Sequence, residues 1–161
     1  MADLNNLISP FFLNDREIKK VIELMFFSYR DFTSGPDKVL DKLNFGRAHH
    51  RVIYFVGKKN NITIKELLGV LKITKQSLSR VLNQLVKEKF ILVSTGSDKR
   101  TKTLSLTDNG KSLENELSNI QINKIKKVIN NFNLEDINGF KKILFEMIEN
   151  DNKKTFQLLN E

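Results

Sequence analysis

The sequence predicts a mainly α-helical fold that contains one small β-hairpin. Apolar residues recur at helical spacing over most of the chain, whereas residues 90–106 combine a β-like run, a turn at Gly96-Ser97 and an alternating return strand. Two short helical stretches joined by three or four residues precede this hairpin. The chain has 161 residues, of which 40% are apolar and 29% charged. That size and composition fit one globular domain with its own core.

The N-terminal part of the chain predicts two helices. The second covers residues 46–58. The first covers residues 15–32, where apolar residues recur at helical spacing: Ile18, Val21, Ile22, Met25 and Tyr29. Between the two helices, Ser34-Gly35-Pro36 interrupts the helical pattern, so we expect the first helix to end before residue 34.

A pair of short capped helices follows. Thr63 and Glu66 form a capping-box pattern that predicts a helix over 64–71. Thr74 has the residue type of an N-cap, and it predicts a second helix over 75–89. Two short helices so closely joined are typical of a helix-turn-helix motif.

The helices predicted for the C-terminal third carry more apolar surface than the small part formed by the helix pair and the hairpin can cover. Helical spacing predicts a helix over about 108–132, and Asn133 predicts the cap of a last helix that runs through Ile148. We therefore expect a second, purely helical part of the molecule.

The charge balance indicates a polyanionic partner. The net charge is +8 and the isoelectric point is about 9.6, which favours nucleic acid or an anionic membrane surface. The absence of cysteine excludes disulfides and thiol catalysis in this chain. No apolar run approaches the ~20 residues that span a bilayer, and the N-terminus lacks the order of a signal peptide. We expect a cytoplasmic protein without membrane contact.

The helix over 75–89 has two distinct faces. Four of its residues fall on one apolar face, and the opposite face carries Gln76, Arg80, Asn83 and Lys87. Arginine can pair with guanine, and Gln or Asn with adenine, so this face suits base edges. The alternative is a solvated polar face. The residues expected in the core are Leu78, Val81, Leu82 and Leu85.

Residues 46–110 resemble the MarR family of winged helix-turn-helix regulators. The matching segments are HRVIYFV, NITIKELLGVLKITKQSLSRVLNQL and SDKRTKTLSLTDNGKSL, the last of which holds the family's Asp-x-Arg wing motif and its L-T-x-x-G sequence. The segments FGRAHHRV and ITKQSLSRVL are similar to a subset of the family found in alphaproteobacteria.

The resemblance implies a sequence-specific regulator, repressor or activator, that binds double-stranded DNA as a homodimer on a palindromic operator. Residues 1–161 would form one MarR-like domain, with 46–110 as its winged part and 10–33 and 111–161 as dimerisation helices. The second helix of the pair would enter the major groove, with its N-terminal half most involved, and the wing would enter the minor groove. Asp98 would orient Arg100. The candidate DNA-binding residues are Thr74, Lys75, Gln76, Ser77, Ser79, Arg80, Asn83, Lys99, Arg100 and Lys102.

The sequence departs from the family pattern at two turns. Lys72 and Lys89 stand where the family often has glycine. Lysine adopts the left-handed conformation only at some energetic cost, so the turn and the helix end are expected to differ slightly. The hairpin is also about one residue shorter than usual, which reduces the expected reach of the wing.

Other functions have weaker support. The main alternative is a winged-helix module that binds another protein. An enzymatic function is a remote third alternative, because no nucleophile–base pair or phosphate-binding glycine loop stands out. No cofactor is expected. His49 and His50 diverge by ~100° on a helix, which predicts one packed and one hydrogen-bonded histidine in place of a metal site.

Two further sets of residues each have more than one explanation. Some MarR relatives bind small effectors between their dimerisation and winged parts, and four residues here are candidates for such a cleft; interface packing and salt bridges explain them as well. Paired phenylalanines near the N-terminus suggest either membrane contact or, as we expect, burial in a dimer. The effector candidates are Tyr29, Arg30, His49 and Arg51, and the phenylalanines are Phe11, Phe12, Phe26 and Phe27.

Overall fold

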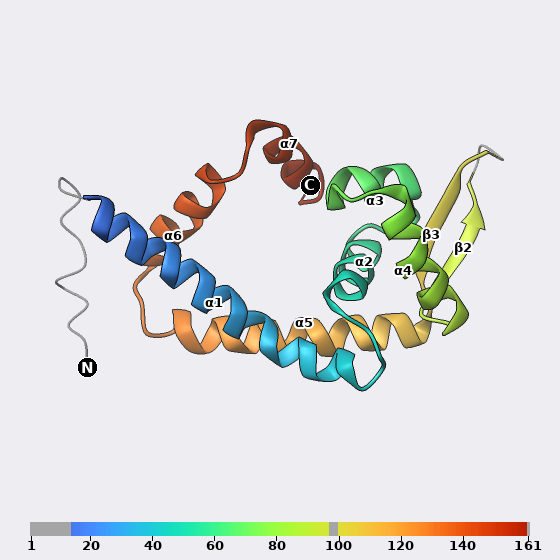
Figure 1. The fold of residues 1–161 in the computed structure, drawn as a ribbon, viewed down its shortest axis with the longest axis horizontal. Helices are drawn as coiled ribbons and strands as arrows, with labels where there is room; N and C mark the ends of the chain where they lie inside the picture. The colour runs from blue at the N-terminus through green and yellow to red at the C-terminus, as the bar shows by residue number, and fades with distance from the viewer. Residues whose placement is uncertain (1–13, 97–99, 161) are drawn as a thin grey trace. The chain divides into compact units, whose positions relative to one another are not determined.

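The computed structural model describes residues 14–96 and 100–160 as a mainly helical chain with a small antiparallel sheet (Figure 1). The chain divides into two compact units, residues 1–34 and 35–161, which we describe separately. The elements are α1 (Asp15–Asp41), α2 (Arg47–Lys58), β1 (Ile62–Thr63), α3 (Ile64–Leu71), α4 (Lys75–Lys87), β2 (Ile91–Thr95), β3 (Lys102–Leu106), α5 (Asp108–Ile129), α6 (Leu134–Glu146) and α7 (Asn150–Leu158).

The first helix is longer than predicted. The expected break at residues 34–36 is wrong, because α1 continues to Asp41 with Pro36 inside it. Pro36 is fully buried, and a Cβ atom on Gly35 would lie 2.6 Å from Cγ2 of Ile120 in α5. Gly35 thus permits close approach of the two helices. Burial against distant residues outweighs the local helix-breaking tendency of the Gly-Pro pair.

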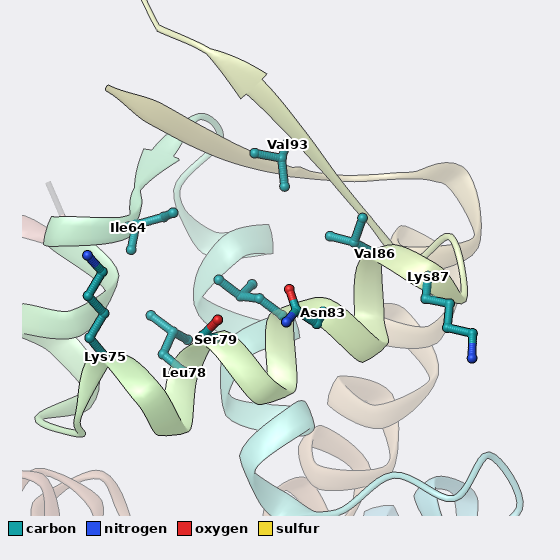
Figure 2. A pocket seen from close by; sticks show the side chains of 9 residues that line it. Ile64, Lys75, Leu78, Ser79, Asn83, Val86, Lys87 and Val93 are labelled. Carbon is teal, nitrogen blue, oxygen red and sulfur yellow. The ribbon is translucent and has the colours of Figure 1, made fainter. Parts of the chain in front are cut away.

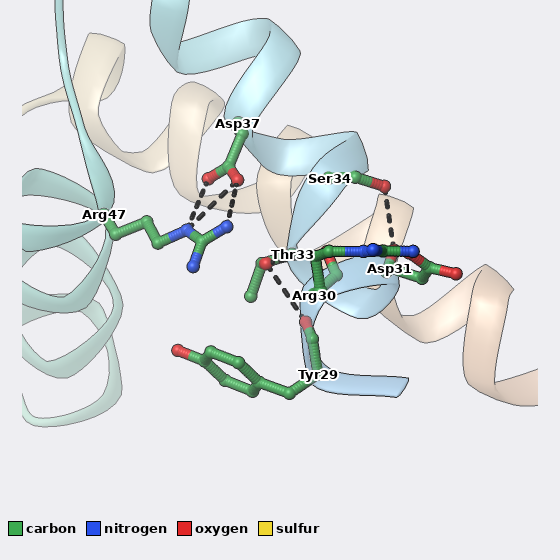
Figure 3. A network of polar contacts seen from close by, with 7 residues as sticks. All are labelled: Tyr29, Arg30, Asp31, Thr33, Ser34, Asp37 and Arg47. Carbon is green, nitrogen blue, oxygen red and sulfur yellow. Dashed lines mark hydrogen bonds and ion pairs between the residues drawn. The ribbon is translucent and has the colours of Figure 1, made fainter. Parts of the chain in front are cut away.

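Polar contacts also support the second half of α1 (Figure 3). Asp37 accepts hydrogen bonds from Nε and Nη2 of Arg47, at 3.1 and 2.8 Å from its Oδ2, and so joins the end of α1 to the start of α2. The buried hydroxyl of Thr33 donates to the carbonyl groups of Tyr29 and Arg30 in its own helix, both at 3.0 Å. A buried hydroxyl with such partners avoids the cost of an unmade hydrogen bond.

The sheet of the second unit has three antiparallel strands in the order β1-β3-β2. The predicted hairpin is present, with pairs from Ile91↔Leu106 to Thr95↔Lys102. The strand β1 was not predicted, because two residues are too few for an alternating pattern. It pairs Ile62 with Leu104, and both side chains are fully buried. The short strand therefore closes the sheet over the core and anchors the start of α3.

The core of the second unit is one mainly aliphatic cluster of side chains from the end of α1, Phe45, α2, α3, α4, the sheet and α5. The predicted apolar face of α4 is confirmed, since its four residues are 0–8% exposed. This burial fixes which face of α4 remains in contact with solvent.

The capping box at the start of α3 is confirmed. Thr63 Oγ1 accepts from the Glu66 backbone N–H at 3.1 Å, and Glu66 Oε2 accepts from the Thr63 N–H at 2.8 Å. Hydrogen bonds from Lys59 and Thr63 lower the pKa of Glu66 to about 2. A lowered folded-state pKa means that ionised Glu66 stabilises the fold above pH ~4.5, and that this contribution is lost as the pH falls toward 2.

The C-terminal helices differ from the prediction. The expected single helix through Ile148 is wrong, because α6 ends at Glu146 and α7 begins at Asn150. The run Asn150-Asp151-Asn152 has the residue types that favour caps and turns over helix interiors, which accounts for the new start. Asn133 does cap α6, with its Oδ1 accepting from Asp136 N at 2.9 Å. Neither α6 nor α7 contains a buried residue.

Candidate nucleic-acid interface

The outer face of α4 is the main candidate site. Its N-cap is the predicted one: Thr74 Oγ1 accepts from the Ser77 backbone N–H at 3.2 Å. The first turn carries no acidic residue, so the helix N-terminus keeps its preference for anions. All seven candidate residues on this helix and its cap are exposed, and five of them line one open hollow of about 650 Å³: Lys75, Gln76, Ser79, Arg80 and Asn83.

The second candidate element is the β2–β3 hairpin. Arg100 and Lys102 are exposed, and Lys102 Nζ lies 3.5 Å from Thr95 Oγ1 on the facing strand. Asp98 and Lys99 lie outside the described residues, so the expected pairing of Asp98 with Arg100 stays a prediction. The structure therefore supports two cationic positions on the return side of the hairpin.

The two lysines that replace glycine take up the left-handed conformation. Lys72 has φ 51° and ψ 40°, and Lys89 has φ 62°. After α4, the Lys89 N–H donates to Val86 O at 3.1 Å and the Phe90 N–H to Leu85 O at 2.8 Å, which closes the helix end. The turns thus keep a geometry that suits glycine, and the chain accepts backbone strain at both.

Lys72→Gly and Lys89→Gly are each expected to increase the free energy of unfolding, by about 1 kcal/mol, because glycine adopts positive φ without a Cβ clash. Urea unfolding monitored by circular dichroism measures this. Lys58→Gly, in the last turn of α2, is the control and is expected to destabilise the protein. Unchanged or lower stability of both turn variants would contradict the assignment of strain.

Thr107 joins the hairpin to α5 and accounts for the L-T-x-x-G pattern. Its hydroxyl donates to Lys89 O at 2.6 Å and accepts from the Gly110 N–H at 3.0 Å. The hydroxyl therefore caps α5 and links the start of this helix to the turn that follows α4. Gly110 packs against the backbone: a Cβ atom there would lie 2.1 Å from Phe90 O. Thr107 and Gly110 therefore fix the position of the backbone at residues 89–90, which connect α4 to β2.

Gly110→Ala is expected to destabilise the protein by about 3 kcal/mol, because a backbone carbonyl cannot move aside as a flexible side chain can. Gly139→Ala in α6 is the matched control: nothing lies within 4 Å of the added Cβ, and alanine favours the helix by about 1 kcal/mol. Thermal and urea unfolding of the two proteins should shift in opposite directions. A Gly110→Ala protein as stable as the wild type would refute this packing.

A hydrogen-bonded chain between α2 and α4 was not anticipated from the sequence. The Gly46 N–H donates to Nδ1 of His49 at 3.0 Å, so the hydrogen of the neutral ring lies on Nε2 and is directed at Gln84 Oε1, 2.9 Å away. The Gln84 amide in turn donates to Glu88 Oε1 at 3.2 Å. The ring also stacks on Phe45, with centroids 4.7 Å apart. The contact between His49 and Gln84 joins residues 35 positions apart in the sequence, so only the three-dimensional structure reveals it.

His49 thus combines the packed role and the hydrogen-bonded role that were predicted for two separate histidines. His50 is partly buried, and this burial lowers its pKa. Among residues 14–96 and 100–160, no group of three or more metal-binding side chains is found. The effector candidates fall in different units, Tyr29 and Arg30 in the first and His49 and Arg51 in the second, and they stay a prediction.

No helix in the described part of the chain is both long and apolar enough to cross a membrane.

The structure resembles solved structures of other proteins. It matches a MarR protein from Peptoclostridium difficile with a TM-score of 0.70 at 18% identity, covering 94% of this chain and 96% of that one. A SlyA-like transcription regulator from Listeria monocytogenes has a TM-score of 0.68 at 19% identity, with 84% and 91% covered. These likenesses confirm the predicted winged-helix fold.

The sequence comparisons identify the family. The family model described as "MarR family" matches residues 43–101. The HTH-type transcriptional regulator PetP of Rhodobacter capsulatus is 38% identical over 151 residues, which cover 93% of this chain and 91% of PetP. Extended identity to a curated regulator, together with the family match over α2 to the hairpin, confirms the predicted resemblance. The chain belongs to the MarR family of helix-turn-helix transcriptional regulators.

Proposed function

We propose that this protein is a transcriptional regulator that binds double-stranded DNA in a sequence-specific manner as a homodimer. The observation that carries the proposal is the outer face of α4, where hydrogen-bonding side chains and cations gather without an acid. The S. aureus regulator MepR, in a variant bound to an oligodeoxyribonucleotide, shares the fold with a TM-score of 0.57 at 18% identity, covering 79% of this chain and 94% of that one.

The chemistry of α4 suits the major groove. Arg80 can donate two hydrogen bonds to guanine, and Gln76 and Asn83 can each pair with adenine. The N-cap Thr74 and the amides of the first turn suit phosphates. Arg100 on the hairpin is offered to the adjacent minor groove, whose negative potential attracts arginine. The other candidate residues serve phosphate contacts beside these.

The homodimer is supported by apolar surface that one chain leaves uncovered. In the first unit, α1 exposes large side chains such as Phe26 (63%) and Phe27 (49%). In the second unit, α6 exposes Phe140 and Ile143 at 55% and 62%. Helices as short as α6 and α7 are marginal in water unless tertiary packing supports them, and neither buries a residue within its own chain. A second copy would supply the missing cover.

Dimeric binding sets the form of the operator. Two symmetric copies read a palindrome, and the two α4 helices must lie about one helical turn, ~34 Å, apart to reach both half-sites. A change in this spacing would switch binding on or off, and the outcome for transcription is repression or activation according to where the operator lies.

Selection of random duplexes by the purified protein tests the proposal. The expected result is a recovered palindrome whose half-site centres lie about 10 base pairs apart, or a multiple of that spacing. Recovery of no common sequence from tightly bound duplexes would contradict specific recognition and would favour the alternative, a winged-helix module for protein partners.

A further inference from the structure

A groove lies beside the hollow described above, between α4 and the strand β2. Its volume is about 550 Å³, and two buried leucines of α4, Leu78 and Leu82, line it. Figure 2 shows Val93 of β2 on one side and the side chains of α4 on the other. The residues that line it are Ile64, Lys75, Leu78, Ser79, Leu82, Asn83, Val86, Lys87 and Val93.

The groove combines exposed apolar walls with positive charge. Val86 and Val93 are 38% and 45% exposed, although they come from different elements. Val93 pairs with the buried Leu104, so it lies on the core-facing side of the sheet but beyond the core. Lys75 and Lys87 line the same groove, and none of the lining residues is acidic. Neither valine offers a hydrogen bond, so neither can read a base by that means.

The position of the groove identifies its occupant, given the proposed function. In a duplex, one sugar-phosphate strand separates the major groove from the adjacent minor groove. If α4 enters the first and the β2–β3 hairpin enters the second, this strand must cross the surface between α4 and β2. The groove is that surface.

We infer that the groove holds this DNA strand by two kinds of contact. Lys75 and Lys87 bind its phosphates, and the walls formed by Val86 and Val93 pack against its deoxyribose rings. Phosphates and sugars are the charged and the less polar parts of one backbone, which matches the mixed chemistry of the groove. The inference adds Val86 and Val93 to the interface, neither of which the sequence placed on the polar face of α4, and it gives Lys87, which lies at the end of that face, a phosphate contact.

The two kinds of contact leave different signatures. A phosphate contact releases counterions, so each lysine contributes about 1 to the slope of log K against log salt. Packing of a sugar against valine buries apolar surface and is nearly independent of salt. Neither contact distinguishes between sequences, because every nucleotide presents the same backbone.

The test compares the wild type with the double variant Val86→Ala/Val93→Ala on a selected duplex and on an unrelated one. We expect about tenfold weaker binding to both duplexes, with the salt slope unchanged. Hydroxyl-radical cleavage, which attacks deoxyribose, should show lost protection of the sugars between the two occupied grooves. Lys87→Gln should instead lower the salt slope by about 1.

One control and one further variant accompany this test. Leu92→Ala changes a residue of the same strand that is 54% exposed on the opposite face of the sheet, and it should leave binding unchanged. Val93→Thr is a second test of the contact: it keeps the shape of the side chain but adds a hydroxyl group to the apolar wall, so it is expected to weaken binding to both duplexes even if the double variant folds poorly.

Three results would overturn the inference. Valine variants that bind and protect DNA as the Leu92→Ala protein does would show that the groove is empty in the complex. A loss confined to one sequence would make the valines base readers. Failure of the wild type to bind any duplex would remove the proposed function as well, and that outcome is distinct because it appears before any variant is compared.

Discussion

The double variant Phe140→Glu/Ile143→Glu is expected to be a monomer and to bind a selected duplex at least ~100-fold more weakly than the wild type. Both side chains are more than half exposed in the single chain, and we place them in the dimer interface. Two carboxylates there would have to be buried without partners, which costs several kcal/mol. A monomer also loses the second half-site, whose linkage to the first raises affinity by roughly 10²–10⁴.

Size-exclusion chromatography with light scattering and fluorescence anisotropy measure the two parts of this prediction. The matched control is Lys141→Gln/Lys142→Gln, which makes the same change in net charge within the same helix and is expected to stay dimeric. A monomeric wild type, or a double variant that remains dimeric with full affinity, would contradict the assigned interface.

Arg80→Ala is expected to weaken binding to the selected duplex by about 10- to 100-fold, with a smaller loss on unrelated DNA. The reason is that a forked pair with guanine discriminates by about 1–3 kcal/mol, whereas a phosphate contact contributes equally to all sequences. Arg80→Lys should recover little of the loss on the selected duplex, because lysine keeps the charge without the planar fork.

Competition binding with the two duplexes measures this difference. Arg16→Ala is the control, since it removes an exposed arginine from the first turn of α1. Equal losses on both duplexes would show that Arg80 contacts only phosphate and would move specificity to other residues of α4.

Local patterns were sufficient for the elements that carry the candidate site. The apolar face of α4 was predictable because its four core residues repeat at helical spacing, and the caps at Thr63 and Thr74 were predictable because their hydrogen bonds span only three residues. The hairpin followed from alternation and a glycine-containing turn. Each of these depends on neighbours in the sequence.

The features that were missed depend on residues far apart in the chain. Gly35 and Pro36 look like a helix end until the contact with Ile120 is known, and the link between His49 and Gln84 joins residues 35 positions apart. The groove between α4 and β2 likewise exists only once the strand is placed beside the helix. No local pattern contains these pairings, so periodicity and propensity cannot supply them.

The retention of genomic DNA fragments by the wild-type protein, measured over a series of salt concentrations, tests the central claim most directly. If α4 and the hairpin bind duplex DNA through their cations, affinity falls steeply, and log K decreases linearly with log salt by about 0.9 for each phosphate neutralised. Sequencing the fragments retained at the highest salt identifies the operator. A wild-type protein that shows no salt-sensitive retention of any genomic fragment would contradict the proposed function.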